Sequence, residues 1–211
     1  MSVVVFSDDY FFTHSVRCLT SIDSQSEENL CIVDVHSFFS LHDINRRLCS
    51  ELTDSYSVII VKGRGMLSSV LSSLEGISRT SSETEFIRFI KEGRRYTAHH
   101  ILDLINNLRE LRSFTHPEIS LASALRRKNN IIATSQFLRC SKKLVYQRVS
   151  TIAHKMNLKY GTQIQYFLHR EYTIEELELI DYIKLRSDID VLQNNEPSPL
   201  TCSPLISTPR C

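Results

Sequence analysis

Residues 131–158 read IIATSQFLRCSKKLVYQRVSTIAHKMNL, and this stretch decides the fold of the C-terminal part of the chain. Apolar residues at helical spacing predict a short helix from Ile131 to Leu138 and a longer one from Ser141 to about Leu158. The residues between them, Arg139-Cys140-Ser141, give the spacing of a helix-turn-helix. The second helix is polar and basic on one face, which suits a helix that enters the major groove of DNA.

The same part of the chain carries a local excess of positive charge. Between Ile119 and Arg170 there are ten Lys or Arg residues and no Asp or Glu, although the formal net charge of the chain is only +1. Such a surface repels itself unless a polyanion shares the space, and phosphate contacts supply most non-specific DNA affinity. From Glu171 to Val191, by contrast, there are seven acids and two bases. This asymmetry predicts double-stranded DNA as a partner.

Helices are also predicted on both sides of this pair. Thr115 can cap a helix over 118–127 that has Pro117 in its first turn, and Thr162 to Leu168 form a further helix. Phe114 to Leu168 then resemble, without a gap, the DNA-binding domain of the LuxR/FixJ family.

Three motifs carry the resemblance. Phe114-Thr115-His116-Pro117-Glu118 stands where the family has Leu-Thr and then Glu, and Ser141-Lys142-Lys143-Leu144-Val145 stands where it has Ser-x-Lys-Thr-Val. His154-Lys155-Met156-Asn157-Leu158 stands where it has a basic pair and Leu-Gly-Val. Two departures are Lys128 at the turn Gly and Ile132-Ala133-Thr134 in place of Lys-Glu-Ile.

The resemblance implies an all-α tetrahelical domain whose third helix reads DNA. It implies that three side chains of that helix face base edges, where Gln can bind adenine and Tyr can touch a thymine methyl. These residues are Tyr146, Gln147 and Ser150. It implies that three cations neutralise phosphates. These residues are Lys142, Lys143 and Lys155.

The N-terminal part alternates short apolar strands with helices, which predicts a small parallel α/β domain. The strands are expected near residues 3–7, 30–35 and 57–61, and a helix with an N-cap at Ser82 or Thr84 ends at Gly93. Residues 3–96 resemble a receiver domain, which often precedes this kind of helix-turn-helix in the family.

The residues of receiver chemistry are only partly present. Asp8 and Asp9 end the first strand, where receivers bind Mg²⁺, and Asp34 stands at the phosphoacceptor position. Lys62 falls where the hydroxyl belongs, and Arg79 or Thr80 falls where the Lys belongs. The stretch between Asp9 and Asp34 is also too short for the usual helix-strand-helix. We therefore predict a degenerate receiver that works without phosphorylation, with one strand-helix step missing, although Asp34 remains a candidate phosphoacceptor.

Five segments follow from these patterns. They are the receiver-like domain 1–96, a linker helix 97–114, the helix-turn-helix domain 115–170, an acidic amphipathic helix 171–193 and a Pro-rich disordered tail 194–211. The acidic helix begins with the capping box Thr173-Ile174-Glu175-Glu176, and we expect Leu177, Ile180 and Ile183 to pack against the chain or a dimer mate.

The function that these features favour is sequence-specific transcription regulation by a dimer, either a homodimer or a pair with a related regulator. An alternative is an interaction adaptor or auxiliary regulator that acts through a heterodimer partner, and a third is Mg²⁺-dependent phosphoryl chemistry. No nucleophile-base pair, phosphate-binding Gly loop or metal-ligand spacing supports an enzyme, a metal, a cofactor or a small-molecule substrate. No apolar run reaches ~18 residues and the N-terminus lacks a signal-peptide pattern, so we expect a cytoplasmic protein without membrane association.

Overall fold

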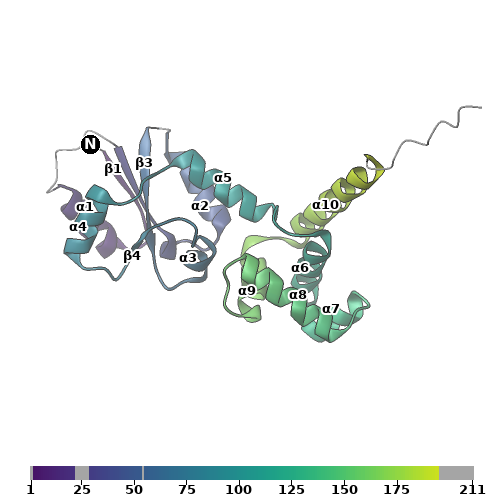
Figure 1. Cartoon of the computed structure of the whole chain (residues 1–211). Coiled ribbons are helices and arrows are strands. Elements are labelled where there is room, and N and C mark those ends of the chain that lie inside the picture. The colour runs from purple at the N-terminus through teal and green to yellow at the C-terminus, as the bar shows by residue number, and fades with distance from the viewer. Residues whose placement is uncertain (1, 22–28, 54, 195–211) are drawn as a thin grey trace, which may run out of the picture.

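The computed structural model describes residues 2–21, 29–53 and 55–194. The N-terminal domain is built on a five-stranded sheet whose first four strands are parallel and lie in chain order (Figure 1). These strands are β1 (Val3–Phe6), β2 (Asn29–Asp34), β3 (Tyr56–Lys62) and β4 (Ile77–Ser78). The fifth, β5 (Tyr96–Thr97), pairs antiparallel with β3. The central strands are apolar almost throughout because both faces of the sheet are covered.

One face of the sheet is covered by α1 (Tyr10–Ser21) and α4 (Glu83–Glu92), where Val16 and Phe86 are buried against β-strand residues. The other face is covered by α2 (Leu41–Glu51), α3 (Met66–Val70) and α5 (Ala98–Arg109) (Figure 1). The sequence prediction of a small parallel α/β domain is confirmed. The carboxyl ends of β1 and β2, with the short 3-10 helix η1 (Val35–Ser37) after β2, place the predicted acidic residues at one edge of the sheet.

The strand order agrees with the predicted loss of one strand-helix step. A receiver has the order 2-1-3-4-5, and removing its second strand leaves the consecutive order seen from β1 to β4. Only residues 22–28, which are not described, separate α1 from β2.

The C-terminal domain is made of four helices and an additional long helix (Figure 1). These are α6 (His116–Lys128), α7 (Ile131–Phe137), α8 (Lys142–Lys155), α9 (Gly161–Glu171) and α10 (Ile174–Asn194). The expected all-α helix-turn-helix fold is therefore present. Helix α6 ends in a left-handed residue at Asn129 (φ 53°), so Lys128 is the last helical residue and the turn position falls on Asn, which tolerates this conformation.

The two domains share one contiguous hydrophobic core and a buried polar contact. The Glu171 carboxylate, at the end of α9, accepts hydrogen bonds from the backbone N–H groups of Leu41 (2.7 Å) and His42 (3.0 Å) at the start of α2. It also accepts one from the Arg109 guanidinium of α5 (2.7 Å). Because a helix N-terminus carries partial positive charge, Glu171 fixes α9 onto the α/β domain.

Helix α10 starts with the predicted capping box, in which Thr173 and Glu176 bond each other's backbone N–H groups at 2.7 Å and 3.1 Å. Its first turns pack against α6, where Leu177 is fully buried and Ile180 is partly buried. Ile183, which we expected on the packed side, is 57% exposed, because at about 100° per residue it lies on a different side of α10 from the buried Leu177. Apart from Asn194, the segment predicted to be a disordered tail lies outside the described residues. No helix in the described part of the chain has the length and apolar character to span a membrane.

Candidate nucleic-acid interface

One face of α8 presents most of the predicted DNA-contacting residues to solvent. The exposed side chains follow one another at helical spacing, and they are Lys142, Lys143, Tyr146, Gln147 and Ser150. The opposite face of α8 is buried in the domain core, with Val145 fully buried and Ile152 1% exposed. The core therefore fixes which face of α8 is free. We call these five exposed residues the α8 face.

Local hydrogen bonds set the start of α8. Ser141 caps the helix by accepting from the backbone N–H of Leu144 (3.2 Å). The preceding turn is closed by Arg139, which is left-handed (φ 50°), and by the Cys140 N–H bonded to the Ser135 carbonyl (3.0 Å). These contacts hold the N-terminal turn of α8, which carries Lys142 and Lys143, at the outer end of the helix-turn-helix.

Lys155 lies apart from the other predicted contacts. Its ammonium donates to the Glu118 carboxylate (2.6 Å) and to the Ser113 carbonyl (3.0 Å), inside the domain. Burial of Glu118 opposes its ionisation, but the hydrogen bonds from Lys155 and Thr115 outweigh burial and lower the pKa of Glu118. The geometry thus gives Lys155 structural partners inside the domain, and these compete with the phosphate contact that the resemblance implies.

The ten Lys and Arg residues between Ile119 and Arg170, which we call the basic block, therefore fall into two groups, those with an acceptor in the chain and those without one. Some of its cations find acceptors from outside the block: Arg127 pairs with Glu178 of α10, and Arg126 donates to the Tyr172 carbonyl (3.2 Å). Within the described residues, Lys142 and Lys143 have no ion-pair partner, and both are exposed. Sequence reasoning missed this division, because the acids that neutralise the block lie before and after it in the chain.

In the α/β domain, by contrast, the acidic residues Asp9 and Asp34 are bonded to other groups of the same domain. Asp34 is fully buried and accepts hydrogen bonds from the Ser7 hydroxyl (2.9 Å), the Ser37 hydroxyl (2.9 Å) and the His36 backbone N–H (3.2 Å). A guanidinium nitrogen of Arg79 lies 3.6 Å from the carboxylate. Both serines were absent from the predicted site, although Ser7 directly follows β1 and Ser37 lies close after Asp34.

Arg79 also reaches the second acid. It is ion-paired and hydrogen-bonded to Asp9, whose other oxygen accepts from the Phe12 backbone N–H (3.1 Å) at the start of α1. The Phe12 hydrogen bond lowers the pKa of Asp9 most, and the Arg79 charge lowers it further. We call Asp9, Asp34 and Arg79, together with Ser7 and Ser37, the acid pocket. Of the two residues predicted at the Lys position, Arg79 is the one that enters it.

The remaining predicted receiver residues point elsewhere. Asp8 is 75% exposed and lies 3.9 Å from Arg47 of α2. Lys62 turns away and donates to the carbonyls of Leu74 and Ser72. No group of three or more His, Cys, Asp or Glu side chains in the described ranges is placed to hold a metal ion.

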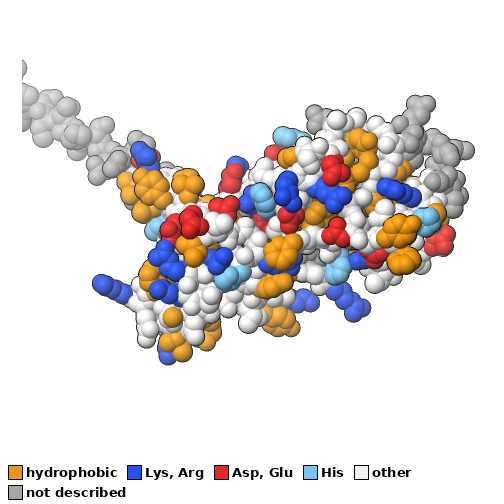
Figure 2. Space-filling view, turned by 180° about the vertical axis from the view of Figure 1, so that it is seen from behind, with side chains coloured by type: hydrophobic (Ala, Val, Ile, Leu, Met, Phe, Trp, Pro, Cys, Tyr) orange, Lys and Arg blue, Asp and Glu red, His pale blue; other side chains and the backbone are white. Residues whose placement is uncertain are grey.

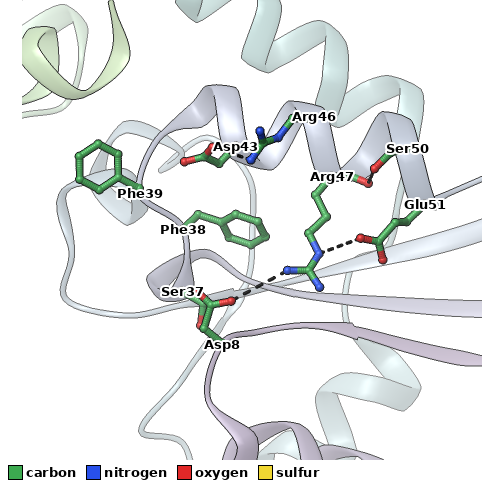
Figure 3. A pocket seen from close by; sticks show the side chains of 9 residues that line it. All are labelled: Asp8, Ser37, Phe38, Phe39, Asp43, Arg46, Arg47, Ser50 and Glu51. Atoms are coloured by element: carbon green, nitrogen blue, oxygen red, sulfur yellow. Dashed lines mark hydrogen bonds and ion pairs between the residues drawn. The ribbon is translucent and has the colours of Figure 1, made fainter.

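A cavity of about 580 Å³ opens beside the acid pocket, between α2 and the residues that follow β1 and β2 (Figure 3). Arg46 and Arg47 point into it, but Arg46 is paired with Asp43 (3.3 Å) and Arg47 with Glu51 (3.1 Å). These cations are therefore already neutralised by the chain.

No family model matches the sequence, and no curated protein matches it. Solved structures do resemble the fold. A structure of the two-component response regulator RcsB-DNA complex aligns with 82% of this chain and 99% of its own, at 13% identity and a TM-score of 0.56. A structure of two RcsB dimers bound to two parallel DNAs covers the same shares at 12% identity and a TM-score of 0.51.

A full-length FixJ from B. japonicum aligns with 86% of this chain and 97% of its own, at 10% identity and a TM-score of 0.32. The two RcsB alignments span both domains. Together with the sheet and the helix order, they show that the chain has the fold of a response regulator: a receiver-like α/β domain followed by an all-α helix-turn-helix domain.

Proposed function

We propose that this protein is a sequence-specific DNA-binding transcription regulator that inserts the α8 face into the major groove. The observation that carries the proposal is the exposure of the α8 face: Lys142 and Lys143 stand exposed at the start of α8 and, in the described residues, lack an acid, whereas Arg127 and Lys155 of the same block pair with Glu178 and Glu118. Two free lysines at the start of a fixed, exposed helix suit phosphate contacts beside a groove.

The other three side chains of the α8 face supply base recognition in this proposal. Gln147 is one turn after Lys143 and can bind adenine with two hydrogen bonds, and Tyr146, 59% exposed, can touch a thymine methyl. Ser150 lies one further turn along and reaches a base edge or a phosphate. The structure of the response regulator RcsB in complex with DNA has the same fold over 82% of this chain, which supports the proposal.

We further propose that regulation does not require phosphorylation of Asp34. The Asp34 carboxylate is buried, both serine hydroxyls bond it, and Arg79 supplies a permanent positive charge where a metal would be needed. An incoming phosphoryl group would have to displace these partners. The α/β domain then serves to position the helix-turn-helix domain, which it contacts through Glu171, without catalysis and without a cofactor.

Phosphorylation independence is tested with acetyl phosphate. The parent protein is expected to take up no phosphate, and Asp34→Asn is expected to bind the selected DNA within about fivefold of the parent, since a change of about 1 kcal/mol is of that size. Stoichiometric uptake of phosphate by the parent that disappears in Asp34→Asn would show that the acid pocket is a working receiver site.

DNA recognition is tested by selecting duplexes from a random pool with the full-length protein. The parent is expected to recover a defined sequence, with affinity that falls steeply with salt, and Lys142→Gln/Lys143→Gln/Gln147→Ala is expected to recover none. Arg64→Gln, which removes an exposed cation of the α/β domain, is the control and should behave as the parent. A parent that selects no sequence and binds duplexes without salt dependence would favour the adaptor function instead.

A further inference from the structure

A second cavity, of about 470 Å³, opens in the C-terminal domain directly beside the α8 face. Two residues of that face, Tyr146 and Ser150, form part of its wall. The opposite wall is the start of α9, where Thr162 and Gln165 line the cavity, and Lys159 lies just before this helix. We call this cavity the α8–α9 groove. A molecule that lies along the α8 face therefore also meets the groove.

The floor of the α8–α9 groove is apolar, and core packing fixes its form. The floor residues come from α6, α7 and α8, and they are Leu125, Ile131, Val149 and Ala153. A Cβ atom at Gly161 would lie 2.9 Å from Cγ1 of Val149, which is closer than van der Waals contact. The absence of a side chain at Gly161 thus lets the start of α9 lie directly against α8. The groove is a product of this close packing.

The charge around the α8–α9 groove favours an anionic occupant. The described residues that line it include one cation, Lys159, and no acid. Lys159 is exposed, and among the described residues its ammonium has no ion-pair partner. In Figure 2, acidic side chains gather near the base of α10, whereas Lys and Arg side chains lie over the lower part of the C-terminal domain. An uncharged small molecule would gain little from this cation, whereas a phosphate group would be attracted by it.

A cationic and hydroxyl-bearing rim above an apolar floor matches the sugar–phosphate backbone of DNA. Lys and Thr side chains are common phosphate contacts, and an apolar floor can pack against the carbon atoms of deoxyribose. The major groove is about 12 Å wide and an α-helix with its side chains is about 10–12 Å across, so a helix in this groove lies against the backbones that border it.

The contact in the α8–α9 groove differs from the one expected at the start of α8. Ser150, in the wall of the groove, is seven residues after Lys143, which corresponds to about 10 Å along the helix axis. Lys159 therefore meets a different phosphate from the one that Lys143 meets.

We propose that the α8–α9 groove receives the sugar–phosphate backbone at one edge of the DNA major groove, with the Lys159 ammonium and the Thr162 hydroxyl on its phosphate. This inference rests on the proposed function, because it requires α8 to lie in the major groove. It extends the DNA interface from one helix to two. Contacts of this kind fix the position of the protein on the duplex and add affinity that does not depend on sequence.

Variants of the full-length protein test the contact by fluorescence anisotropy on the selected duplex at several salt concentrations. Lys159→Gln is expected to reduce the slope of log affinity against log salt by about 0.9, the value for one phosphate contact on B-DNA. Thr162→Val keeps the size of the side chain without its hydroxyl, and we expect about a fivefold loss of affinity, as for one hydrogen bond. The matched control is Lys184→Gln on α10, which packs on α6, and it should keep the parent's slope.

Neutral phosphates locate the contact on the DNA. Methylphosphonates are placed one at a time in the selected duplex, and the parent is expected to lose affinity where it contacts a phosphate. At one of these positions the replacement should have no further effect on Lys159→Gln. Lys143→Gln should become insensitive at a different position.

The outcomes separate this inference from the proposed function. A parent that binds DNA with a steep salt dependence, together with a Lys159→Gln variant that keeps the parent's slope and its set of sensitive phosphates, would overturn the groove contact alone. Equal changes of slope in Lys159→Gln and Lys184→Gln would also overturn it, because net charge would then explain both. A parent whose binding to every duplex is independent of salt would overturn the groove contact and the proposed function together.

Discussion

The acid pocket of the α/β domain and the α8 face both contain residue types that a response regulator uses, but their charges are handled in opposite ways. In the pocket, Asp9 and Asp34 share the guanidinium of Arg79, and two serines complete the hydrogen bonds of Asp34. On α8, Lys142 and Lys143 are exposed and, among described residues, have no acid. Charges that are satisfied by their own chain stabilise the fold, whereas unpaired charges at a fixed surface are available to a partner.

This difference makes two kinds of mutation separable. Replacing an internally paired group should lower the free energy of unfolding, and replacing a residue of the α8 face should lower DNA affinity while stability is kept.

Glu171→Ala should have the largest effect. It removes a carboxylate that is 1% exposed and leaves the Arg109 guanidinium and two backbone N–H groups without their acceptor. Breaking such a buried contact costs about 3–5 kcal/mol of unfolding free energy, which urea denaturation measures. A loss below about 1 kcal/mol would mean that the pairing of Glu171 between the domains contributes little to stability.

Glu171 also gives a pH dependence. Burial raises the pKa of its carboxyl, although hydrogen bonds from Leu41 and Arg109 act against burial. A carboxyl with a raised folded-state pKa binds protons more tightly in the folded protein, so the part of stability that depends on its protonation is full below about 4.5 and is lost as pH rises through the raised pKa, while the contacts of the carboxylate remain. Glu171→Gln should therefore gain stability relative to the parent as pH rises through this window.

Arg79→Ala should have the next largest effect, because it leaves the buried Asp34 carboxylate without its cation. We expect a loss of about 2–4 kcal/mol in unfolding free energy, less than for a fully buried pair because Arg79 is 22% exposed. Arg79→Lys should restore part of it, since Lys supplies the charge but not the two-sided geometry. Stability equal to the parent in Arg79→Ala would show that the serines alone satisfy Asp34.

Gln147→Ala tests the α8 face, the exposed member of the comparison. The variant should lose about 1–3 kcal/mol of binding free energy at the selected sequence and tolerate a different base at one position. Its unfolding free energy should stay within about 0.5 kcal/mol of the parent, because an exposed side chain without internal contacts is removed. The control is Gln136→Ala, another exposed Gln on the neighbouring helix α7. Equal losses in both variants would move the recognition surface away from α8.

The sequence predicted the order of strands and helices well because local signals are strong there. Apolar runs such as Val58 to Val61 mark buried strands, and capping residues such as Ser82, Ser141 and Thr173 mark helix starts that the structure confirms. Through the resemblance to receivers, the sequence also placed Arg79 or Thr80 at the Lys position, and Arg79 is the one that contacts Asp9 and Asp34. What it could not supply was the partner of each charge. Lys155 finds Glu118 across 37 positions and Glu171 finds Leu41 across 130, and no local pattern encodes such pairings.

A comparison of Lys143→Gln with Lys155→Gln has the smallest expected effect. It separates an exposed lysine from an internally paired lysine within one helix. Lys143 is exposed, and we expect its loss to weaken all duplexes about equally and to reduce the slope of log affinity against log salt by about 0.9 for one phosphate contact. Lys155 is bound to Glu118 and Ser113, so its loss should cost about 1–2 kcal/mol of stability and leave the salt slope unchanged. Fluorescence anisotropy at several salt concentrations and urea denaturation provide the two readouts. If Lys155→Gln also lowered the salt slope by about one contact, its ammonium would have to leave Glu118 on binding DNA. Internal pairing in the free protein would then fail to distinguish structural cations from those that contact phosphate.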